Sequence, residues 1–524
     1  MAKRTRIQDL DSDSLLQIFS FYRLEDEHNW NVRIKWKRLA HVCQRWRRLM
    51  FDLRSHLDMC LLLKNGSPSI DTLNHLSLLP LAINYSHGTR ATESKDEDDL
   101  QFGLQQHGRV RGVTLQAPSS SLCIWLELMN KIYPRLKDLS LLSTTAKEMN
   151  LVLPEKFRAP LLRHLSLHGI ALPKGLALLS STVALSTLSL THIRDACYFP
   201  LGHLVTQLQD LPHLEELFIG FAISIPLPSG DGELLPAPIP PVTLPALRRL
   251  TFRGEDIYLE NLVAQINTPL LERLSLTLLF DLAFTLVNLN SFIHRTERLG
   301  CRVIFSKDRA SMYFEEQGIE TLDLCVDCGP LDWQIDSATQ VCIALGNITP
   351  AVEVLTIDLD VDGMPSDWQN TLDSMLWHEL LLPFIGVKKL HIGSSLTLEL
   401  SQVLKSVAGG LALELLPELQ ELEVHLRTDQ EKMEFSAFIK NRKSAGRPVH
   451  LQEKYSVTSN SKEQGFIANA GAFLSNSLNR LTRQMPSANE SRGDDRIDEA
   501  LKLANEYESV IDPKDRKALQ DSIS

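Results

Sequence analysis

The sequence has few of the features by which secreted and membrane proteins are recognised. Its 8 cysteines are spread over 524 residues, too sparsely for a disulfide scaffold. No apolar run approaches the roughly 20 residues that a membrane-spanning helix needs. The start, Met-Ala-Lys-Arg-Thr-Arg, lacks the apolar segment of a signal peptide. We therefore expect an intracellular protein with reduced cysteines, in the cytoplasm, the nucleus or both, and no membrane partner.

Positive charge is also in short supply. The chain has 54 lysines and arginines against 65 acidic residues, a net charge of −11. A dedicated nucleic-acid-binding protein would carry a basic excess. We therefore expect no nucleic-acid partner, although a local basic patch is compatible with this total.

Motifs that carry catalysis are missing too. The sequence has no glycine-rich phosphate loop, no His-Glu-x-x-His and no Gly-x-Ser-x-Gly. Cys325-Val326-Asp327-Cys328 is a lone Cys-x-x-Cys without the second pair that a structural zinc site needs, so we interpret both cysteines as packing residues. The sequence favours a protein that is not an enzyme and has no cofactor or metal. A hydrolase on an α/β fold is the weakest alternative, because no acid, base and nucleophile can be named.

The segment from Ile7 to Met50 has the pattern of two short amphipathic helices. Asp11, Ser12 and Asp13 precede the first apolar stripe and are good helix caps. A segment of this size is too small for a self-sufficient core, so it must dock on the rest of the chain or on another protein. The stripes consist of Leu15, Ile18, Phe19 and Tyr22, and of Leu39, Val42, Cys43, Trp46, Leu49 and Met50.

This segment resembles an F-box. The resemblance rests on an apolar arm, a helix ending in Ile-Phe and a second helix with Val-Cys-x-basic-Trp; a proline usual after the arm is Asp11 here. It implies docking on the Skp-type adaptor of an SCF ubiquitin ligase and, through it, on a cullin scaffold. The implied adaptor-binding residues are Ile7, Leu10, Leu15, Ile18, Phe19, Val42, Cys43 and Trp46. Alternatives are ordinary core helices that pack on the repeats, or a basic helix that binds nucleic acid.

From residue 110 onward, a short pattern, apolar-x-x-apolar-x-apolar, recurs. The early spacing is about 26 residues, within the range of leucine-rich repeats. The last two apolar positions of each unit alternate, which predicts a short strand with one face in the core. The units begin at Val110, Leu136, Leu162, Leu185, Leu214, Leu247, Leu271, Ile319, Val352, Val387 and Leu419.

The array resembles irregular leucine-rich repeats, since the asparagine that usually follows each strand is missing from most units. With the front segment, the chain is similar to fungal F-box proteins with such repeats. The expected fold is α/β: a helical F-box module, then a horseshoe-like solenoid of short parallel strands, then a partly disordered tail. A general α/β domain with parallel strands is the alternative.

The pattern divides the chain into four parts. We expect a helical module over 1–56, a junction over 57–109 with strand, helix and strand, the solenoid over 110–449, and a flexible tail with short helices over 450–524. Three irregular segments are an exposed acidic loop at 92–99, a proline-rich insertion at 223–245 and a β-hairpin at 299–317.

The outward strand positions of a solenoid usually bind its partners. Arg249, Arg253 and Arg273 form a basic cluster there, together with Arg248, and His168 lies on an earlier strand. An acidic or phosphorylated target would suit these residues. Ordinary solvated charges are the simpler interpretation.

The sequence thus predicts the substrate-recognition subunit of an SCF-type ubiquitin ligase, a monomer within its complex, whose repeats hold a target protein. The alternative is a repeat scaffold without ligase association, whose front helices cap the array. Exposure of Leu15, Phe19 and Trp46 distinguishes the two, because docking requires an open stripe and capping a buried one.

Overall fold

The computed structural model spans the whole chain. It describes residues 10–21, 42–52, 60–64, 70–87, 94–145, 151–173, 177–194, 199–222, 241–279, 284, 286–293, 300–316, 319–360, 374–406, 415–426 and 429–453. All of these belong to one compact unit, Met1–Tyr455. No helix in these ranges is long and apolar enough to cross a bilayer.

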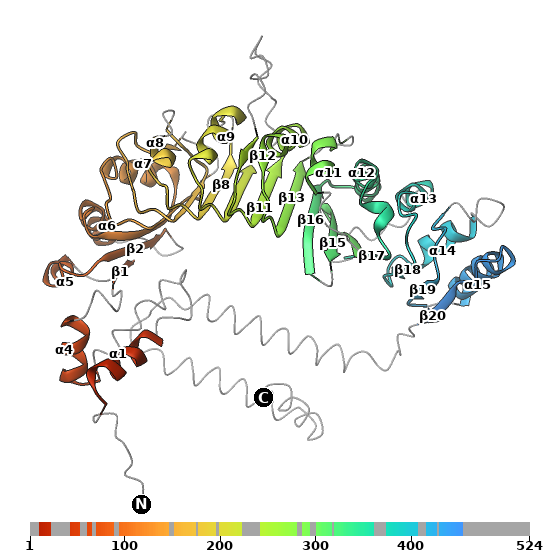
Figure 1. Ribbon diagram of the computed structural model, residues 1–524, viewed down its shortest axis with the longest axis horizontal. Helices are drawn as coiled ribbons and strands as arrows, with labels where there is room; N and C mark the ends of the chain where they lie inside the picture. The colour runs from red at the N-terminus through yellow and green to blue at the C-terminus, as the bar shows by residue number, and fades with distance from the viewer. Residues whose placement is uncertain are drawn as a thin grey trace, which may run out of the picture. The chain divides into compact units, whose positions relative to one another are not determined.

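A large, mostly parallel sheet organises the unit (Figure 1). Its strands follow the order β1-β2-β3-β4-β6-β8-β9-β11-β13-β16-β15-β14-β17-β18-β19-β20. Their bounds are β1 Leu61–Lys64, β2 Leu81–Ser86, β3 Val110–Ala117, β4 Asp138–Ser143, β6 His164–His168, β8 Thr187–Ile193, β9 Glu216–Phe221, β11 Arg249–Gly254, β13 Arg273–Leu279, β14 Gly300–Phe305, β15 Arg309–Glu316, β16 Ile319–Asp327, β17 Val354–Leu359, β18 Lys389–Ile392, β19 Glu421–Val424 and β20 His450–Glu453.

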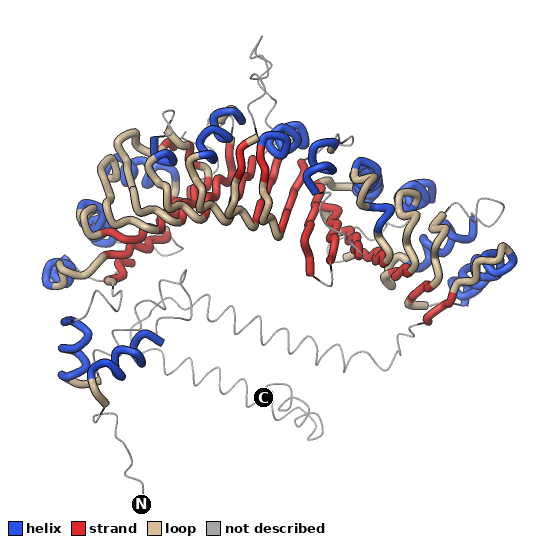
Figure 2. The backbone as a smooth tube through the Cα atoms, in the orientation of Figure 1, coloured by secondary structure: helices blue, strands red, loops and turns tan. Residues whose placement is uncertain are grey.

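Helices connect most of these strands and lie on one side of the sheet (Figure 2). They are α5 Ile70–His75, α6 Ser94–Gln105, α7 Ser119–Leu128, α8 Ala177–Ser180, α9 Leu201–Gln209, α10 Asp256–Gln265, α11 Val287–Ile293, α12 Leu331–Ala344, the 3-10 turn Thr349–Ala351, α13 Ser374–Leu381, α14 Thr397–Ser406 and α15 Asp429–Ser444. Two short strand pairs, β5 Leu151–Val152 with β7 Ile170–Ala171 and β10 Val242–Thr243 with β12 Ile266–Asn267, lie outside the large sheet.

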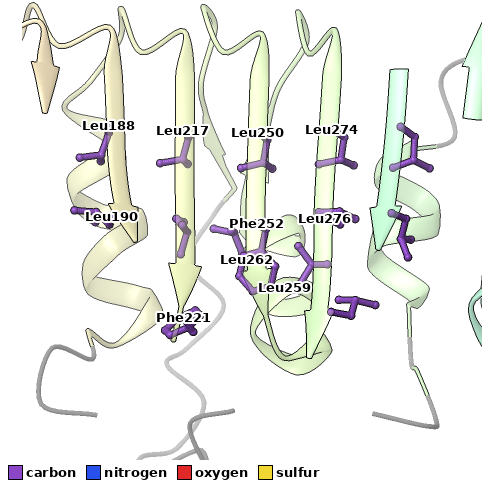
Figure 3. Close-up of a cluster of buried hydrophobic side chains, with 14 of the residues drawn as sticks. Leu188, Leu190, Leu217, Phe221, Leu250, Phe252, Leu259, Leu262, Leu274 and Leu276 are labelled. Carbon is purple, nitrogen blue, oxygen red and sulfur yellow. The ribbon is translucent and has the colours of Figure 1, made fainter. Parts of the chain in front are cut away.

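The strands predicted from the recurring pattern are confirmed, and their pairing is in register. Leu188, Leu217, Leu250 and Leu274 occupy the same position on four neighbouring strands and form one buried row (Figure 3). Leu259 and Leu262 of α10 lie close to this region, also buried. Truncating such a buried leucine to alanine typically lowers the free energy of unfolding by about 2–5 kcal/mol. Each strand therefore depends on the neighbouring strands that keep its leucine buried.

The opposite side of the strands carries polar residues. In β6, Leu165 and Leu167 are buried while His164, Ser166 and His168 are half-buried. This alternation follows from the two-residue period of a strand. We call the side away from the helices the polar face.

The predicted hairpin is confirmed and changes the strand order. β14 pairs antiparallel with β15, and β15 pairs antiparallel with β16. As a result β16 returns to lie beside β13, and β14 lies beside β17. Residues about 50 positions apart in sequence therefore become neighbours on the polar face.

The front segment has two described helices, α1 Ser12–Phe21 and α4 Gln44–Asp52. The expected cap is present, because the Ser14 amide donates a hydrogen bond of 2.7 Å to Asp11 Oδ1. The second helix begins at Gln44, so Val42 and Cys43 lie in the turn before it. Ile7, Tyr22 and Leu39 lie outside the described residues.

The junction contains the expected strand, helix and strand as β1, α5 and β2. The expectation of an exposed loop at 92–99 is wrong for its described part, because α6 begins at Ser94. Asp96 and Glu97 lie in its first turn, where negative charge favours a helix. Leu100 and Leu104 are buried and hold the helix on the sheet.

The array extends beyond its predicted end at residue 449. β20 pairs with β19 and extends the sheet to Glu453, beyond residue 449. Most of the proline-rich insertion and the tail beyond 453 lie outside the described residues. Val242 and Thr243, at the end of the insertion, pair with Ile266 and Asn267.

Arg109 provides a test of how the first units are held together. Its guanidinium donates to the carbonyls of Leu73, Leu76 and Leu79 at 2.8–3.0 Å, so one side chain satisfies three acceptors around the end of α5. Burial lowers the pKa of Arg109. We expect Arg109→Met to destabilise this region by about 2–4 kcal/mol, since charged hydrogen bonds contribute about 1.5–3 kcal/mol each but are partly replaced by water.

Native-state hydrogen exchange measures this effect locally. Amides of β1, β2 and α5 should exchange faster in Arg109→Met, while those of β17 to β19 keep their protection, because units of an array contact mainly their neighbours. Lys440→Met, an exposed change on α15, is the control. Unchanged exchange in β1 and β2 would show that the guanidinium contributes little.

Candidate functional site: the N-terminal helices and the polar face

Two contacts hold the N-terminal helices together. Phe19 of α1 packs edge-on against Trp46 of α4, with ring centroids 4.9 Å apart. Arg45 Nη2 donates to the carbonyl of Leu10 at 2.6 Å and ties the arm before α1 to α4. The hydrogen bond from the Ser14 amide keeps the pKa of Asp11 below its usual value.

Exposure divides the predicted adaptor-binding residues into two groups. Leu15, Phe19 and Trp46 are 0%, 3% and 7% exposed and belong to the core. Ile18 and Val42 are 37% and 57% exposed, and Cys43 is exposed as well. Leu10 is half-buried. We call Ile18, Val42 and Cys43 the N-terminal surface.

The two groups bear differently on docking and capping. The buried group is what the capping alternative expects, and these residues are not available to a partner in this conformation. The N-terminal surface is compatible with docking, because the aliphatic side chains of Ile18 and Val42 are exposed to solvent although the apolar stripe of the same helices is buried. In this conformation a partner can reach Ile18, Val42 and Cys43 but not Leu15, Phe19 or Trp46.

The polar face carries a row of small hydroxyl side chains. Register places Thr114, Ser140, Ser166 and Ser189 on four neighbouring strands. Phe218 follows on β9, and Thr251 and Ser275 continue the row. All seven are half-buried.

The basic cluster expected to hold an acidic target is neutralised within the chain. Arg249 pairs with Glu216 at 2.7 Å, Arg253 with Asp327 at 2.7 Å, and Arg273 with Glu320 at 3.8 Å. Arg248 pairs with Glu272. The four arginines therefore provide no excess of positive charge for a target, and the simpler interpretation of solvated strand charges fits them better. Such exposed pairs each contribute about 0–1 kcal/mol.

The hairpin and the strand after it, β16, add further ion pairs to this region. Arg302 lies between Glu315 at 3.6 Å and Glu320 at 2.6 Å. Arg309 lies 3.7 Å from Asp327, which also pairs with Arg253. Carboxylates of β16 thus lie between the arginines of β11 and β13 on one side and those of β15 and β14 on the other.

His168 belongs to a cluster that the sequence pattern does not reveal. Its ring stacks on that of His192 with centroids 4.9 Å apart, and its Nδ1 lies 3.1 Å from Thr191 Oγ1. His192 has a positive φ of 54°, and Arg194 Nη2 donates to its Nε2 at 2.8 Å. Burial first, and the Arg194 charge second, lower the pKa of both histidines. Both shifts favour the neutral form of the rings.

A second histidine pairs with a carboxylate one unit away. His164 Nδ1 lies 2.7 Å from Asp138 Oδ1 on the neighbouring strand. The two positions are 26 residues apart, which is the early spacing of the repeats, so aligning the units predicts this contact.

The lone Cys-x-x-Cys is buried, as expected for packing residues. Burial raises the pKa of Cys325 and of Cys328 to about 11, so both are thiols at neutral pH. Cys325 contacts Ser311 Oγ at 3.3 Å and Asp323 Oδ1 at 3.5 Å. Within the described ranges, no three His, Cys, Asp or Glu side chains are arranged to hold a metal ion.

No model of a known protein family matches the sequence, and no curated protein shows significant similarity to it.

The stacked histidines predict a pH dependence of stability. Their pKa values are lower in the folded chain than the usual 6.5, so below that pH the unfolded chain binds more protons and folding loses stability. Arg194 and Arg253 face His192, which adds repulsion when the rings are charged. We expect the unfolding midpoint in urea to fall between pH 7.5 and 5.5, and to fall less in His168→Gln/His192→Asn; asparagine suits the positive φ.

His75→Gln, a change of an exposed histidine at the end of α5, is the matched control and should keep the wild-type pH dependence. If the unfolding midpoint of the double variant fell with pH as steeply as that of the wild type, protonation of the stacked rings would not be what destabilises the fold.

Proposed function

We propose that the chain is the substrate-recognition subunit of an SCF-type ubiquitin ligase, with an F-box-like N-terminal module and an array of irregular leucine-rich repeats. The N-terminal surface binds the Skp-type adaptor, and the array holds a target protein. The observation that carries the proposal is the exposure of Ile18 and Val42 beside helices whose own stripe is buried.

Three features support this assignment. The apolar residues of α1 and α4 match the F-box pattern, the strands that follow pair in parallel at the spacing of leucine-rich repeats, and the polar face has outward side chains on every unit. The mechanism is proximity. Holding the target beside the transfer machinery raises the effective concentration of its lysines, and no side chain of this chain takes part in a bond-making step.

The burial of Leu15, Phe19 and Trp46 favours a second candidate, a leucine-rich-repeat interaction scaffold without ligase association. In this candidate the N-terminal helices stabilise the first units and bind no adaptor. The two candidates differ in what Ile18 and Val42 do: in the first they lose solvent on complex formation, and in the second they remain exposed.

Adaptor binding tests the proposal with the full-length chain. Purified Skp-type adaptor should bind the wild-type chain, and Ile18→Asp/Val42→Asp should weaken binding by at least about tenfold, since charges in the middle of an apolar interface are costly. Both side chains are exposed, so the substitutions leave the core intact, unlike changes at Leu15 or Phe19.

Ile124→Asp/Ile343→Asp is the control, because these side chains on α7 and α12 are both 57% exposed and lie away from the N-terminal surface. It should bind the adaptor as the wild type does, with Kd measured by titration calorimetry. Absence of wild-type binding at micromolar concentrations would support the scaffold candidate. Equal loss in both double variants would mean that the N-terminal surface is not the docking site.

A further inference from the structure

A β-bulge interrupts the sheet beside the two stacked histidines. The register between β8 and β9 shifts after Leu190. Between the last pair before the shift and the first pair after it, β8 has two residues, Thr191 and His192, while β9 has only Gly220. A bulge breaks the alternation of side chains along a strand and changes the direction of one of them. This break brings the ring of His192 onto that of His168.

His192 has a backbone conformation that side-chain-bearing residues seldom adopt. Its φ of 54° lies in the left-handed region, and within the described ranges only one other non-glycine residue, Leu416, has a positive φ. Glycine or asparagine would adopt this conformation more readily. Backbone strain of this kind gathers at functional sites. The bulge and the positive φ therefore indicate that the position of the His192 ring has a use of its own.

Hydrogen bonds around the rings leave several N–H groups available. Arg194 Nη2 donates to His192 Nε2, so this nitrogen is the acceptor and the ring carries its proton on Nδ1. Among the described residues, neither His192 Nδ1 nor the other N–H groups of the Arg194 guanidinium have a partner. His168 Nδ1 interacts with Thr191 Oγ1 and leaves its Nε2 available. Such a set of donors suits a negatively charged oxygen atom.

The charge of Arg194 is not balanced by a carboxylate of the described chain. Arg194 and Arg253 both face His192. Arg253 pairs with Asp327 at 2.7 Å, whereas the partner of Arg194 in the described ranges is the His192 ring. The cluster formed by the two histidines and Arg194 therefore carries one positive charge without a counter-charge from the described residues.

The carboxylates of the neighbouring strands lie elsewhere on the polar face. Asp138 of β4 pairs with His164, and Glu216 of β9 pairs with Arg249. Each of these residues precedes by four positions the residue of its own strand that belongs to the row of His168, which corresponds to about 13 Å along a strand. These two pairs therefore do not neutralise Arg194.

Small side chains surround the cluster and leave room for a ligand. Gly220 lies in the same row as Thr191 and Arg253, and a Cβ atom added to it would be 3.6 Å from Thr191 Cγ2 and 3.7 Å from Arg253 Cβ. The next row has the short side chains of Ser166 and Ser189. His168, His192 and Arg194 are themselves half-buried, so a partner can reach them.

We propose that His168, His192 and Arg194, which we call the histidine site, bind the carboxylate of an acidic side chain of a partner protein. The guanidinium of Arg194 pairs with the carboxylate, and His192 Nδ1 donates a hydrogen bond to it. One positive charge matches one carboxylate, whereas a phosphorylated side chain carries close to two negative charges at neutral pH. The proposal rests on the part of the proposed function that both candidates share, a partner protein held by the array.

Carboxylate binding at this site depends on pH. In the free chain, burial and the Arg194 charge lower the pKa of both histidines. A carboxylate beside the rings favours their protonated form, so it raises these pKa values and the complex binds more protons than the free chain. The affinity therefore rises as the pH falls from 8 to 6, a range in which a glutamate side chain remains ionised.

The test is fluorescence anisotropy with the full-length chain and three labelled peptides with blocked ends. They share the sequence Ala-Leu-Xaa-Leu-Ala, and Xaa is glutamate, glutamine or phosphoserine. The glutamate peptide should bind at least about tenfold more tightly than the glutamine peptide, since only the former brings a charge to Arg194. Its affinity should increase about threefold or more from pH 8 to pH 6, and that of the glutamine peptide should stay constant.

Matched variants locate the site. Arg194→Gln should weaken binding of the glutamate peptide about tenfold or more, and His168→Gln/His192→Asn should remove the pH dependence of what binding remains. Arg135→Gln makes the same change of charge at an exposed position before β4 and should bind as the wild type does. Adaptor binding, measured separately, should be unchanged in Arg194→Gln, so failure of this site and failure of the ligase assignment are distinguishable.

Four outcomes would overturn the proposal. They are equal affinity for the glutamate and glutamine peptides, including no binding of either, the same loss in Arg135→Gln as in Arg194→Gln, and a wild-type affinity that does not change with pH. The fourth is tighter binding of the phosphoserine peptide than of the glutamate peptide, which would assign the site to phosphate. Circular dichroism of each variant confirms that the fold is retained.

Discussion

In-register pairing of parallel strands is the constraint on which the rest of this structure depends. A single unit exposes the leucines of its strand and cannot bury them alone. Pairing with the next unit places Leu250 beside Leu217 and Leu274, so that each row is covered by helices such as α10. Because the side chains alternate, the same register also decides which polar residues meet on the other face. The core and the candidate surfaces therefore have one common origin.

Register brings charged residues within a few ångströms of one another, and this explains why most of them are paired. From β9 to β16 the arginines of the polar face have carboxylates on the next strand, as with Arg249 and Glu216, or two strands away, as with Arg253 and Asp327. Ion pairs that are this exposed add little to the free energy of unfolding. Two like charges side by side without a counter-charge lower it by a similarly small amount.

The recurring apolar pattern was sufficient to predict the strands, because burial of one face requires a period of two within each unit. It was insufficient for the charge pairs that involve the hairpin. β14 and β15 come between β13 and β16 in sequence, yet β16 lies beside β13, and this brings Asp327 to Arg253. Only this strand order shows that Arg253 and Arg273 are paired, with Asp327 and Glu320 of β16. The acidic run at 92–99 was wrongly interpreted as a loop. Its charged residues lie at the beginning of α6, and the buried leucines that hold this helix on the sheet, Leu100 and Leu104, come after the run.

An apolar stripe likewise does not distinguish a helix's own core from a surface that binds a partner. Ile18 and Phe19 are adjacent in sequence, but successive side chains on a helix point about 100° apart. Phe19 therefore packs on Trp46 while Ile18 remains 37% exposed at the edge of the stripe. Val42 precedes α4 and is also outside the packed interface. If a partner binds here, it meets side chains that the small helical module cannot cover by itself, and the buried residues serve to hold those side chains in place.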